Sequence, residues 1–313
     1  MDRFLALGAF AKVVEQGSFA RAAGRLGIST SAVSRHVADL EAHLGARLLH
    51  RTTRRLSLTE SGRAFHERAV QLLADLEEAE AAVTESTLVP RGTLKLTCPI
   101  TFGERHLAPA IAAFATRHPQ LRFDVDLSDR VVDLVDEGCD LAVRIGSAGG
   151  ATLIARRIGE TQLVCCAAPS YVATAGVPAT PAELAGHPCL AYTYLAVPDV
   201  WRFTDAAGAT HDVRVSGPLD ANNGRFLAAL AATGMGIALE PDFIVGDDIR
   251  SGRLVALLPG YRPPASPIFA VYPSHRHLSA KVRLFVDFLA ARFAADAPWS
   301  LRADEVRRVP RRR

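Results

Sequence analysis

The sequence predicts a multidomain α+β protein, in which an N-terminal all-helical domain is joined by one long helix to a C-terminal α/β domain. Three observations predict it. Apolar residues recur at helical spacing over the first 60 residues, a heptad stripe follows, and from residue 92 onward strand-like and helix-like segments alternate. A chain of 313 residues, 49% of them hydrophobic, is long enough for two or three such domains.

Short helices separated by glycines open the chain. The first carries Phe4, Leu7 and Phe10 on one face, the second spans Phe19 to Leu26, and Gly27 suits a tight turn. The third has an apolar stripe of Val33, Val37, Leu40 and Leu44. Its opposite face, near the N-terminus, presents Thr30, Ser31, Ser34 and Arg35. Short hydroxyls and one guanidinium leave room to enter a DNA major groove, so the pattern indicates a helix-turn-helix, although Ala-rich helical hairpins are common.

A basic, hydroxyl-rich stretch follows, from Leu48 to Thr59. The alternation of Leu56 and Leu58 predicts a strand, and the stretch as a whole predicts a β-hairpin wing. Its tip would carry four side chains to the phosphate backbone or minor groove: Arg51, Thr53, Arg54 and Arg55. The alternative for each arginine is a solvated surface charge.

Residues 61–88 predict a linker helix that dimerises. Its apolar positions are separated by four, three, four, three and four residues: Phe65, Ala69, Leu72, Leu76, Ala79 and Val83. So narrow a stripe needs a partner helix, and a helix-turn-helix needs a dimer to read two half-sites. We therefore expect a dimer seam at Phe65, Leu72, Leu76 and Val83. The alternative is that this stripe packs against its own domain.

Charge is unevenly distributed. Residues 1–63 hold 10 basic and 5 acidic residues, residues 64–301 hold 20 and 26, and residues 302–313 hold 6 and 2. A basic head on an acidic body is typical of a DNA-binding module attached to a domain that does not bind DNA. We expect residues 301–313 to form a disordered basic tail. The chain shows neither a membrane-spanning apolar window nor a signal peptide, so we expect a cytoplasmic protein without membrane contact.

The sequence favours neither an enzyme nor a metalloprotein. Five cysteines in no paired spacing indicate free thiols, and adjacent Cys165 and Cys166 suit a buried strand better than a redox sensor. His275 and His277 have a metal-like spacing but no further ligands can be named. No phosphate-binding loop, nucleophile elbow or paired carboxylates are recognisable. We expect no catalytic residues, no cofactor and no metal.

From Leu94 the chain predicts two α/β lobes within a domain at residues 89–300. Lobe I covers about 92–161 and 266–300, and lobe II about 162–265, with two crossovers. The expected strands are Leu94–Cys98, Arg122–Leu127, Asp140–Ile145, Leu163–Ala167, Val213–Val215, Gly236–Leu239 and Ile268–Tyr272. The expected helices are His106–Arg117, Val131–Glu137, Arg225–Thr233 and Ser279–Phe293.

The run from Ser18 to Gly62, SFARAAGRLGISTSAVSRHVADLEAHLGARLLHRTTRRLSLTESG, resembles the defining segment of the LysR family of bacterial transcriptional regulators. LKLTCPITFGERHLAP, DLSDRVVDLVDEGCDLAVRIG and LSAKVRLFVDFLAARF resemble the family's effector domain. The resemblance covers about residues 1–295. It implies a winged helix-turn-helix over residues 1–60, with Thr30, Ser31, Ser34 and Arg35 on the recognition helix and Arg51, Thr53 and Arg54 in the wing. It also implies core positions at Ala22, Ala23, Val33 and Leu40.

The resemblance further implies a C-terminal domain like the type 2 periplasmic binding proteins, with a small anionic or polar effector between its lobes. In open α/β sheets ligands bind beyond strand C-termini. The candidate contacts are Thr101, Phe102, Ser128, Arg144, Asn222 and Asn223. Each of these residues alone is commonly a cap or turn residue, and Cys98 departs from a hydroxyl often found nearby.

The implied partners are promoter DNA, the effector, a second copy of the chain in a dimer or tetramer, and RNA polymerase as a further candidate. The competing function is a bare solute-binding module, which would lack salt-dependent DNA affinity.

Overall fold

The computed structural model describes residues 2–51, 56–83, 89–150, 153–195, 197–274, 279–294, 297–301 and 305. The chain forms two compact units, Met1–Val89 and Pro90–Arg313. Predictions that concern Thr53, Arg54, Arg55, the His275–His277 pair and most of the tail after Leu301 fall outside the described residues. Among those described, no helix is long and apolar enough to cross a membrane.

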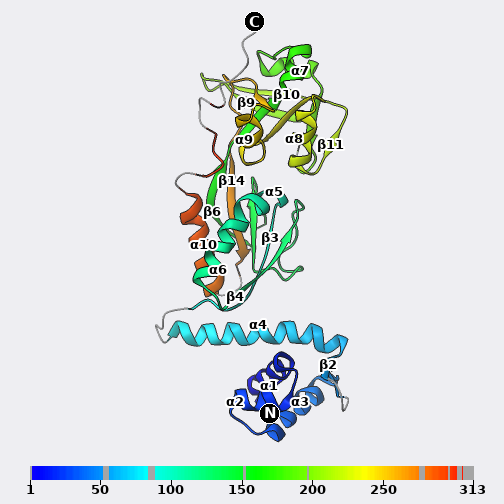
Figure 1. Cartoon of the computed structure of the whole chain (residues 1–313), viewed down its shortest axis with the longest axis vertical. Coiled ribbons are helices and arrows are strands. Elements are labelled where there is room, and N and C mark those ends of the chain that lie inside the picture. The colour runs from blue at the N-terminus through cyan, green and yellow to red at the C-terminus, as the bar shows by residue number, and fades with distance from the viewer. Residues whose placement is uncertain are drawn as a thin grey trace. The chain divides into compact units, whose positions relative to one another are not determined.

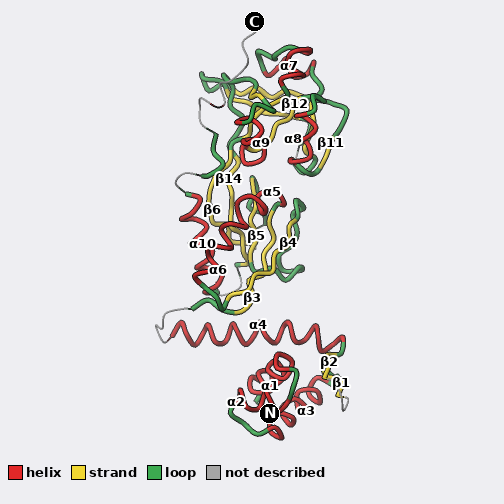
Figure 2. Tube along the Cα trace, in the orientation of Figure 1, coloured by secondary structure: helices red, strands yellow, loops and turns green. Residues whose placement is uncertain are grey.

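The first unit is helical with one small hairpin (Figure 2). Its elements are α1 (Arg3–Gln16), α2 (Phe19–Leu26), α3 (Thr30–Leu44), β1 (Leu49–Arg51), β2 (Leu56–Leu58) and α4 (Glu60–Val83). The first three helices each end at a glycine with φ between 60° and 68°, a conformation that favours glycine. The predicted core positions Ala22, Ala23, Val33 and Leu40 are buried, as expected.

Helix α4 begins in tight contact with the residues before the hairpin. Thr59 Oγ1 donates to the Arg47 carbonyl at 2.7 Å and accepts from the Gly62 amide at 2.8 Å. A Cβ at Gly62 would lie 1.9 Å from the Leu48 carbonyl oxygen. Only glycine therefore fits where the helix crosses Leu48, and the long helix is attached firmly to the hairpin.

The second unit contains two five-stranded sheets, each the centre of one lobe (Figure 1). In lobe I the strand order is β4-β3-β5-β14-β6, with β3 parallel to β4 and β5, and β14 antiparallel to β5 and β6. The strands are β3 (Gly92–Cys98), β4 (Leu121–Leu127), β5 (Leu141–Ile145), β6 (Leu153–Thr161) and β14 (Ser266–Pro273). The helical elements are α5 (Ile100–Phe102), the π-helical turn η1 (Gly103–Leu107), α6 (Ala108–Arg117) and α10 (Ala280–Phe293).

Lobe II has the strand order β11-β8-β12-β7-β13 and a separate hairpin of β9 and β10. Its strands are β7 (Leu163–Ala167), β8 (Cys189–Tyr192), β9 (Val200–Thr204), β10 (Thr210–Arg214), β11 (Asp220–Ala221), β12 (Ile237–Pro241) and β13 (Val255–Ala256). Its helical elements are α7 (Pro169–Ala175), the 3₁₀ turn η2 (Pro181–Gly186), α8 (Gly224–Ala232) and α9 (Asp242–Arg250).

A buried ion pair joins the last helix to the sheet of lobe I. Lys281 Nζ lies 3.0 Å from Asp140 Oδ2 and donates to the Thr93 carbonyl at 2.6 Å, while the Lys95 amide donates to the same carboxylate oxygen. Both charged side chains are less than a tenth exposed. Because each charge has its counter-charge and hydrogen bonds, the pair fixes α10 against β3 and the end of the loop before β5.

Two predicted helices differ from the structure. The helix expected at Val131–Glu137 is absent, and residues 134–138 form a turn. Asp133 Oδ1 accepts from the amides of Val135 and Asp136, and this local bonding competes with a helix. The helix expected to begin at His106 begins six residues earlier, as α5 and the π-helical turn that leads into α6.

Candidate functional site

The N-terminal end of α3 is an exposed polar surface above a buried apolar stripe. Ser29 caps the helix, its Oγ accepting from the Ala32 amide at 3.1 Å. Val33 and Val37 are fully buried on the opposite side. Of the predicted contacts, Thr30, Ser31 and Arg35 are exposed and Ser34 is half-buried. The structure thus places all four on one helix end, where hydroxyl groups and one guanidinium are available to a partner.

The expected wing is a two-stranded antiparallel hairpin. Arg51 pairs with Leu56 at the last register position before the tip. Thr53 and Arg54, which were also predicted to make contacts, fall outside the described residues. Glu41 of α3 fastens the base of the hairpin, since its Oε1 accepts from the amides of Leu48 and Leu49 at 2.8 and 3.1 Å. Helix α3 and the hairpin are therefore held in a fixed relation.

The residues of the predicted dimer seam on α4 fall into two groups that differ in burial. Phe65 packs on Phe10 of its own unit, with ring centroids 5.9 Å apart, and Ala69 is fully buried. Leu72 is 53% exposed, and Leu76 is half-buried. Phe65 thus belongs to the core of its own unit, because the first turns of α4 cover α1. Phe65 is half-buried, so this packing accounts for its place in the stripe without a second chain, and the seam expected at Leu72, Leu76 and Val83 stays a prediction.

One polar contact crosses from lobe I to lobe II at the start of α5. Asp129 Oδ1 accepts from the Ile100 amide at 3.0 Å, and Asp129 Oδ2 accepts from Asn223 Nδ2 at 2.7 Å. Asn223 also caps α8, its Oδ1 accepting from the Phe226 amide at 2.9 Å. The carboxylate of Asp129 therefore sits between the first amide of one helix and the capping residue of another. Of the predicted effector contacts, Asn223 is the one that joins the two lobes in this way.

A buried carboxyl group lies close to this contact. Glu240, at the end of β12, is 2% exposed, and its Oε1 has no hydrogen-bond partner among the described residues. A Cβ at Gly224 would lie 2.2 Å from Glu240 Oε2, so α8 begins directly against the carboxyl group. Burial, reinforced by the negative charge of Asp129, raises the pKa of Glu240 to about 8. At neutral pH this group is predominantly protonated and can donate a hydrogen bond.

The remaining predicted effector contacts differ from one another in burial and in hydrogen-bond partners. Thr101 is 6% exposed, Ser128 Oγ accepts from the Arg130 amide at 3.2 Å, and exposed Asn222 donates to the Tyr194 hydroxyl at 3.1 Å. Arg144 is 9% exposed, and its guanidinium donates to the carbonyls of Val132 and Ala148. It holds a loop of lobe I in place rather than offering a free charge.

Phe102 is a core residue. It is fully buried and packs in T-shaped geometry against Phe243, Phe293 and Trp299, at centroid distances of 5.5, 5.7 and 5.3 Å. A ligand could reach it only after these rings separate. The expectation that Phe102 contacts an effector is corrected for this reason.

Sequence reasoning missed Asp129, Glu240 and Tyr192. Asp129 stands in a loop that the sequence does single out, next to Ser128. Glu240 carries a detectable signal, because it is an acidic residue inside the apolar run Ile237–Pro241. For Tyr192, burial raises the pKa, and the nearby charges of Asp129 and Glu240 act in the same direction. Asp129 could accept hydrogen bonds from a polar ligand, and an additional anion would meet its charge, whereas Glu240 and Tyr192 keep their protons.

Both units match models of one protein family. Residues 4–63 match the family described as "Bacterial regulatory helix-turn-helix protein, lysR family", and residues 89–294 match "LysR substrate binding domain". Among similar curated proteins, the HTH-type transcriptional regulator DmlR of Escherichia coli is 39% identical over 293 residues, 93% of this chain and 95% of that protein. The regulator CrgA of Neisseria meningitidis is 37% identical over 284 residues, 90% of this chain and 94% of that protein.

Solved structures of LysR-type regulators are also similar to this chain. The structure of CrgA from Neisseria meningitidis, a LysR-type transcriptional regulator, aligns with a TM-score of 0.58 at 36% identity and covers 92% of this chain and 97% of that one. The full-length Vibrio cholerae virulence activator AphB, a member of the LTTR protein family, aligns with a TM-score of 0.58 at 29% identity, covering 91% and 98%.

Proposed function

The chain belongs to the LysR family of bacterial helix-turn-helix transcriptional regulators, and from this premise we propose how its two units divide the work. It is a DNA-binding regulator rather than an enzyme, and its C-terminal unit carries the family's effector-binding domain. Members of the family bind DNA and small-molecule effectors and form oligomers. We propose which residues of this chain contact DNA, which contact the effector, and how copies of the chain assemble.

The N-terminal end of α3 enters the major groove. Its exposed hydroxyls and the Arg35 guanidinium, opposite a buried stripe, are the observation that supports this assignment most directly. Ser31 and Ser34 approach the base edges beside Arg35, and Thr30 approaches the backbone near the capped helix terminus. The wing adds phosphate or minor-groove contacts through Arg51, Thr53 and Arg54.

Two copies pair through α4. The 53% exposure of Leu72, in a helix of 24 residues, supports a seam that includes Leu72, Leu76 and Val83. A dimer gives two recognition helices for two half-sites, and a further pairing of dimers gives a tetramer. We place the protein in the cytoplasm, where its DNA lies, and RNA polymerase is a further candidate partner.

The effector binds where the lobes meet around Asn223. Thr101, Ser128, Asn222 and Arg144 belong to the same proposed site, Arg144 as a residue that holds the surrounding loop. The Asp129–Asn223 contact supports this location, because a ligand that exchanges with it changes how the lobes are held together. The negative charge of Asp129 favours a polar effector with hydrogen-bond donors over an anionic one, whereas protonated Glu240 offers a hydrogen-bond donor.

DNA binding tests the assignment of the first unit. The probe is the DNA upstream of the chain's own reading frame, with a random duplex of equal length as the control, and anisotropy is measured at several salt concentrations. We expect affinity to fall steeply with salt, and Arg35→Ala to weaken specific binding by about 1–3 kcal/mol with little effect on the random duplex. Equal losses on both duplexes would place Arg35 on the backbone, and salt-independent or absent binding would contradict the proposal.

The dimer seam has its own test. Leu72→Glu combined with Leu76→Glu brings four carboxylates to one seam, so we expect folded monomers in sedimentation experiments and loss of binding to a two-half-site duplex. The matched control is Val70→Glu, a substitution at an exposed apolar position of α4 outside the stripe. An unchanged dimer mass in the double variant would move the interface elsewhere.

A further inference from the structure

The chain continues past the family's effector domain and returns to the core. The match to that domain ends at residue 294, whereas residues 297–301 and Glu305 are described in the structure. Trp299 is 2% exposed, although Pro298 and Ser300 on either side follow no regular helix or strand. A large aromatic side chain buried from an irregular segment indicates that the segment is held in place by packing.

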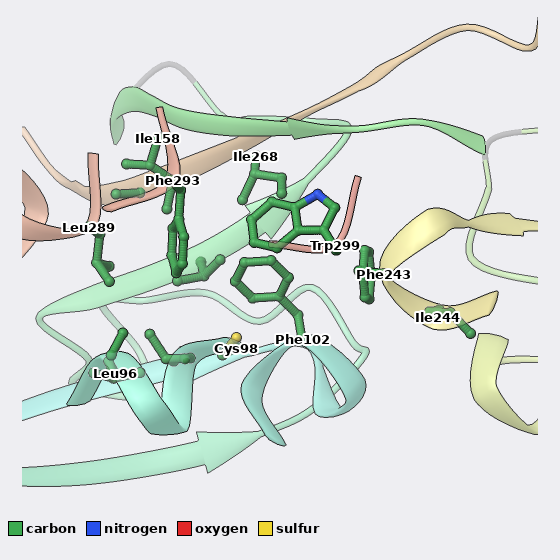
Figure 3. Close-up of a cluster of buried hydrophobic side chains, with 14 of the residues drawn as sticks. Leu96, Cys98, Phe102, Ile158, Phe243, Ile244, Ile268, Leu289, Phe293 and Trp299 are labelled. Atoms are coloured by element: carbon green, nitrogen blue, oxygen red, sulfur yellow. The ribbon is translucent and has the colours of Figure 1, made fainter. Parts of the chain in front are cut away.

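Trp299 is anchored in lobe I. Its ring lies 5.3 Å from Phe102, 4.7 Å from His106 and 5.3 Å from Phe293, measured between centroids. Its Nε1–H donates to the Glu160 carbonyl at 3.1 Å, on β6. Figure 3 shows the indole among the labelled apolar side chains, with Phe102 on one side and Phe243 of α9 on another.

The same segment is bound to lobe II through α9. Arg250 donates from Nη2 to the Ser300 carbonyl at 3.4 Å and from Nε to Glu305 Oε1 at 3.1 Å. A Cβ at Gly246 would lie 3.7 Å from both the Trp299 carbonyl oxygen and Leu301 Cδ2. The segment therefore runs across α9 and connects it to the core of lobe I.

The contact is made where α9 already meets lobe I. Thr161 Oγ1 donates to Asp242 Oδ1 at 2.6 Å, and Arg105 lies 3.1 Å from Asp247. Beside them is a cavity of about 260 Å³, whose walls include Arg105, Phe243 and Trp299. Incomplete packing at this place leaves α9 room to shift against lobe I once the segment is released.

We propose that residues 297–301, together with Glu305, form an intramolecular strap that limits the change in angle between the two lobes and so regulates the response of the effector site. This inference rests on the proposed effector site between the lobes. A ligand changes the lobe angle only by its difference in affinity for the two arrangements, so a strap that favours one arrangement sets how large that difference must be.

Two truncations of the full-length chain form a matched pair. Both remove basic residues from the C-terminus, but truncation after Ala294 removes the strap and truncation after Glu305 retains it. In hydrogen–deuterium exchange we expect the first to speed exchange of the α9 amides, Asp242–Arg250, at least tenfold, while β3 and β12 change less than twofold. The second truncation matches the intact chain. Equal effects of the two truncations, or equal acceleration over both sheets, would overturn the proposal.

A milder variant keeps the test informative if the shorter chain does not fold. Trp299→Phe retains an aromatic ring but loses the hydrogen bond to Glu160. We expect exchange in α9 to rise about threefold, since one neutral hydrogen bond contributes roughly that factor or somewhat more. No rise in α9, or a rise only in the β9–β10 hairpin, would contradict an anchoring role.

Fluorescence separates the strap from global unfolding. The chain has two tryptophans, and Trp201→Phe leaves Trp299 as the single one. We expect the Trp299 emission to shift to the red at lower urea than the loss of far-UV circular dichroism. Coincident transitions would overturn the idea of a separable strap. DNA binding by the first unit is measured independently. Absence of DNA binding would reject the proposed function without deciding whether the strap exists. The exchange and fluorescence results decide only whether the strap exists.

Discussion

Two contacts between lobes I and II are built from opposite chemistry. One, the aromatic contact, sets buried Phe102 of α5 against buried Phe243 of α9, with ring centroids 5.5 Å apart. The other, the polar contact, is the hydrogen bond from Asn223 to Asp129 beside the buried Glu240. Ring packing has no small-molecule substitute, whereas a hydrogen bond can be exchanged for a bond to a ligand or to water. The first contact therefore suits a pivot, and the second suits a switch.

The aromatic contact gives the largest expected effect. Phe102→Ala removes a fully buried ring from four aromatic neighbours, so we expect the free energy of unfolding of the C-terminal unit to fall by about 3–5 kcal/mol in urea titrations. The matched control is Phe226→Ala, at a phenylalanine that is 50% exposed, where the change stays within about 0.5 kcal/mol. Equal losses in the two variants would show that Phe102 is not a structural pivot.

The carboxyl group beside the polar contact gives the next largest effect. The folded pKa of Glu240, about 8, lies above its ordinary value of 4.5, so the folded state holds the proton more tightly than the unfolded state does. The chain consequently loses stability as the pH rises from 4.5 to 8. Glu240→Gln abolishes this loss, and we expect the variant to exceed the parent by about 4 kcal/mol at pH 8 relative to pH 4.5, since each pKa unit corresponds to about 1.4 kcal/mol. Glu104→Gln, at an exposed site, serves as the control. Parallel pH–stability curves for parent and Glu240→Gln would refute this assignment.

Asn223 combines a cap with the polar contact, and two variants separate the roles. Asn223→Ala loses both, and we expect thermal unfolding to report a loss of about 1 kcal/mol, the usual cost of a missing N-cap. Asn223→Ser keeps a capping oxygen for the Phe226 amide but is too short to reach Asp129 in the same way. Recovery of most of the stability by serine would assign the energy to the cap; no recovery would assign it to the contact between lobes.

Asn222 provides the smallest effect and the sharpest contrast with its neighbour. Its side chain is exposed and bonds to Tyr194 within lobe II. We expect Asn222→Ala to change the melting temperature by no more than corresponds to about 0.5 kcal/mol. A loss as large as that of Asn223→Ala would mean that the polar contact extends beyond the Asp129–Asn223 bond.

The same difference in chemistry explains what the sequence could predict. The α3 surface is continuous in the chain, so periodicity alone assigned Val33 and Val37 to the core and left Ser31 and Arg35 outside. The polar contact joins residues 94 positions apart, and no local pattern pairs Asp129 with Asn223. Phe102 was misassigned because a strand-end loop predicts a ligand site, whereas the strap residue Trp299 and Phe243 of α9 come from distant segments to bury it.

The predicted helix at Val131–Glu137 was wrong because local hydrogen bonds to a side chain compete with helix formation. Val131–Glu137 has apolar residues at helical spacing, but Val131 is 75% exposed and Asp133 bonds to amides of its own turn. Leu134 alone reaches the core there. Burial of one side chain does not offset the cost of ordering a helix, and the segment remains a turn.

The close fit of Gly62 beneath Leu48 makes α4 a lever arm. At 1.5 Å per residue its 24 residues span about 36 Å, so a tilt of about 5° at the glycine would displace the far end by about 3 Å. Conversely, a displacement of about 3 Å imposed at Val83 would rotate the base of the wing by only a few degrees. A larger residue at position 62 would loosen this joint and make the reach from one recognition helix to the other imprecise.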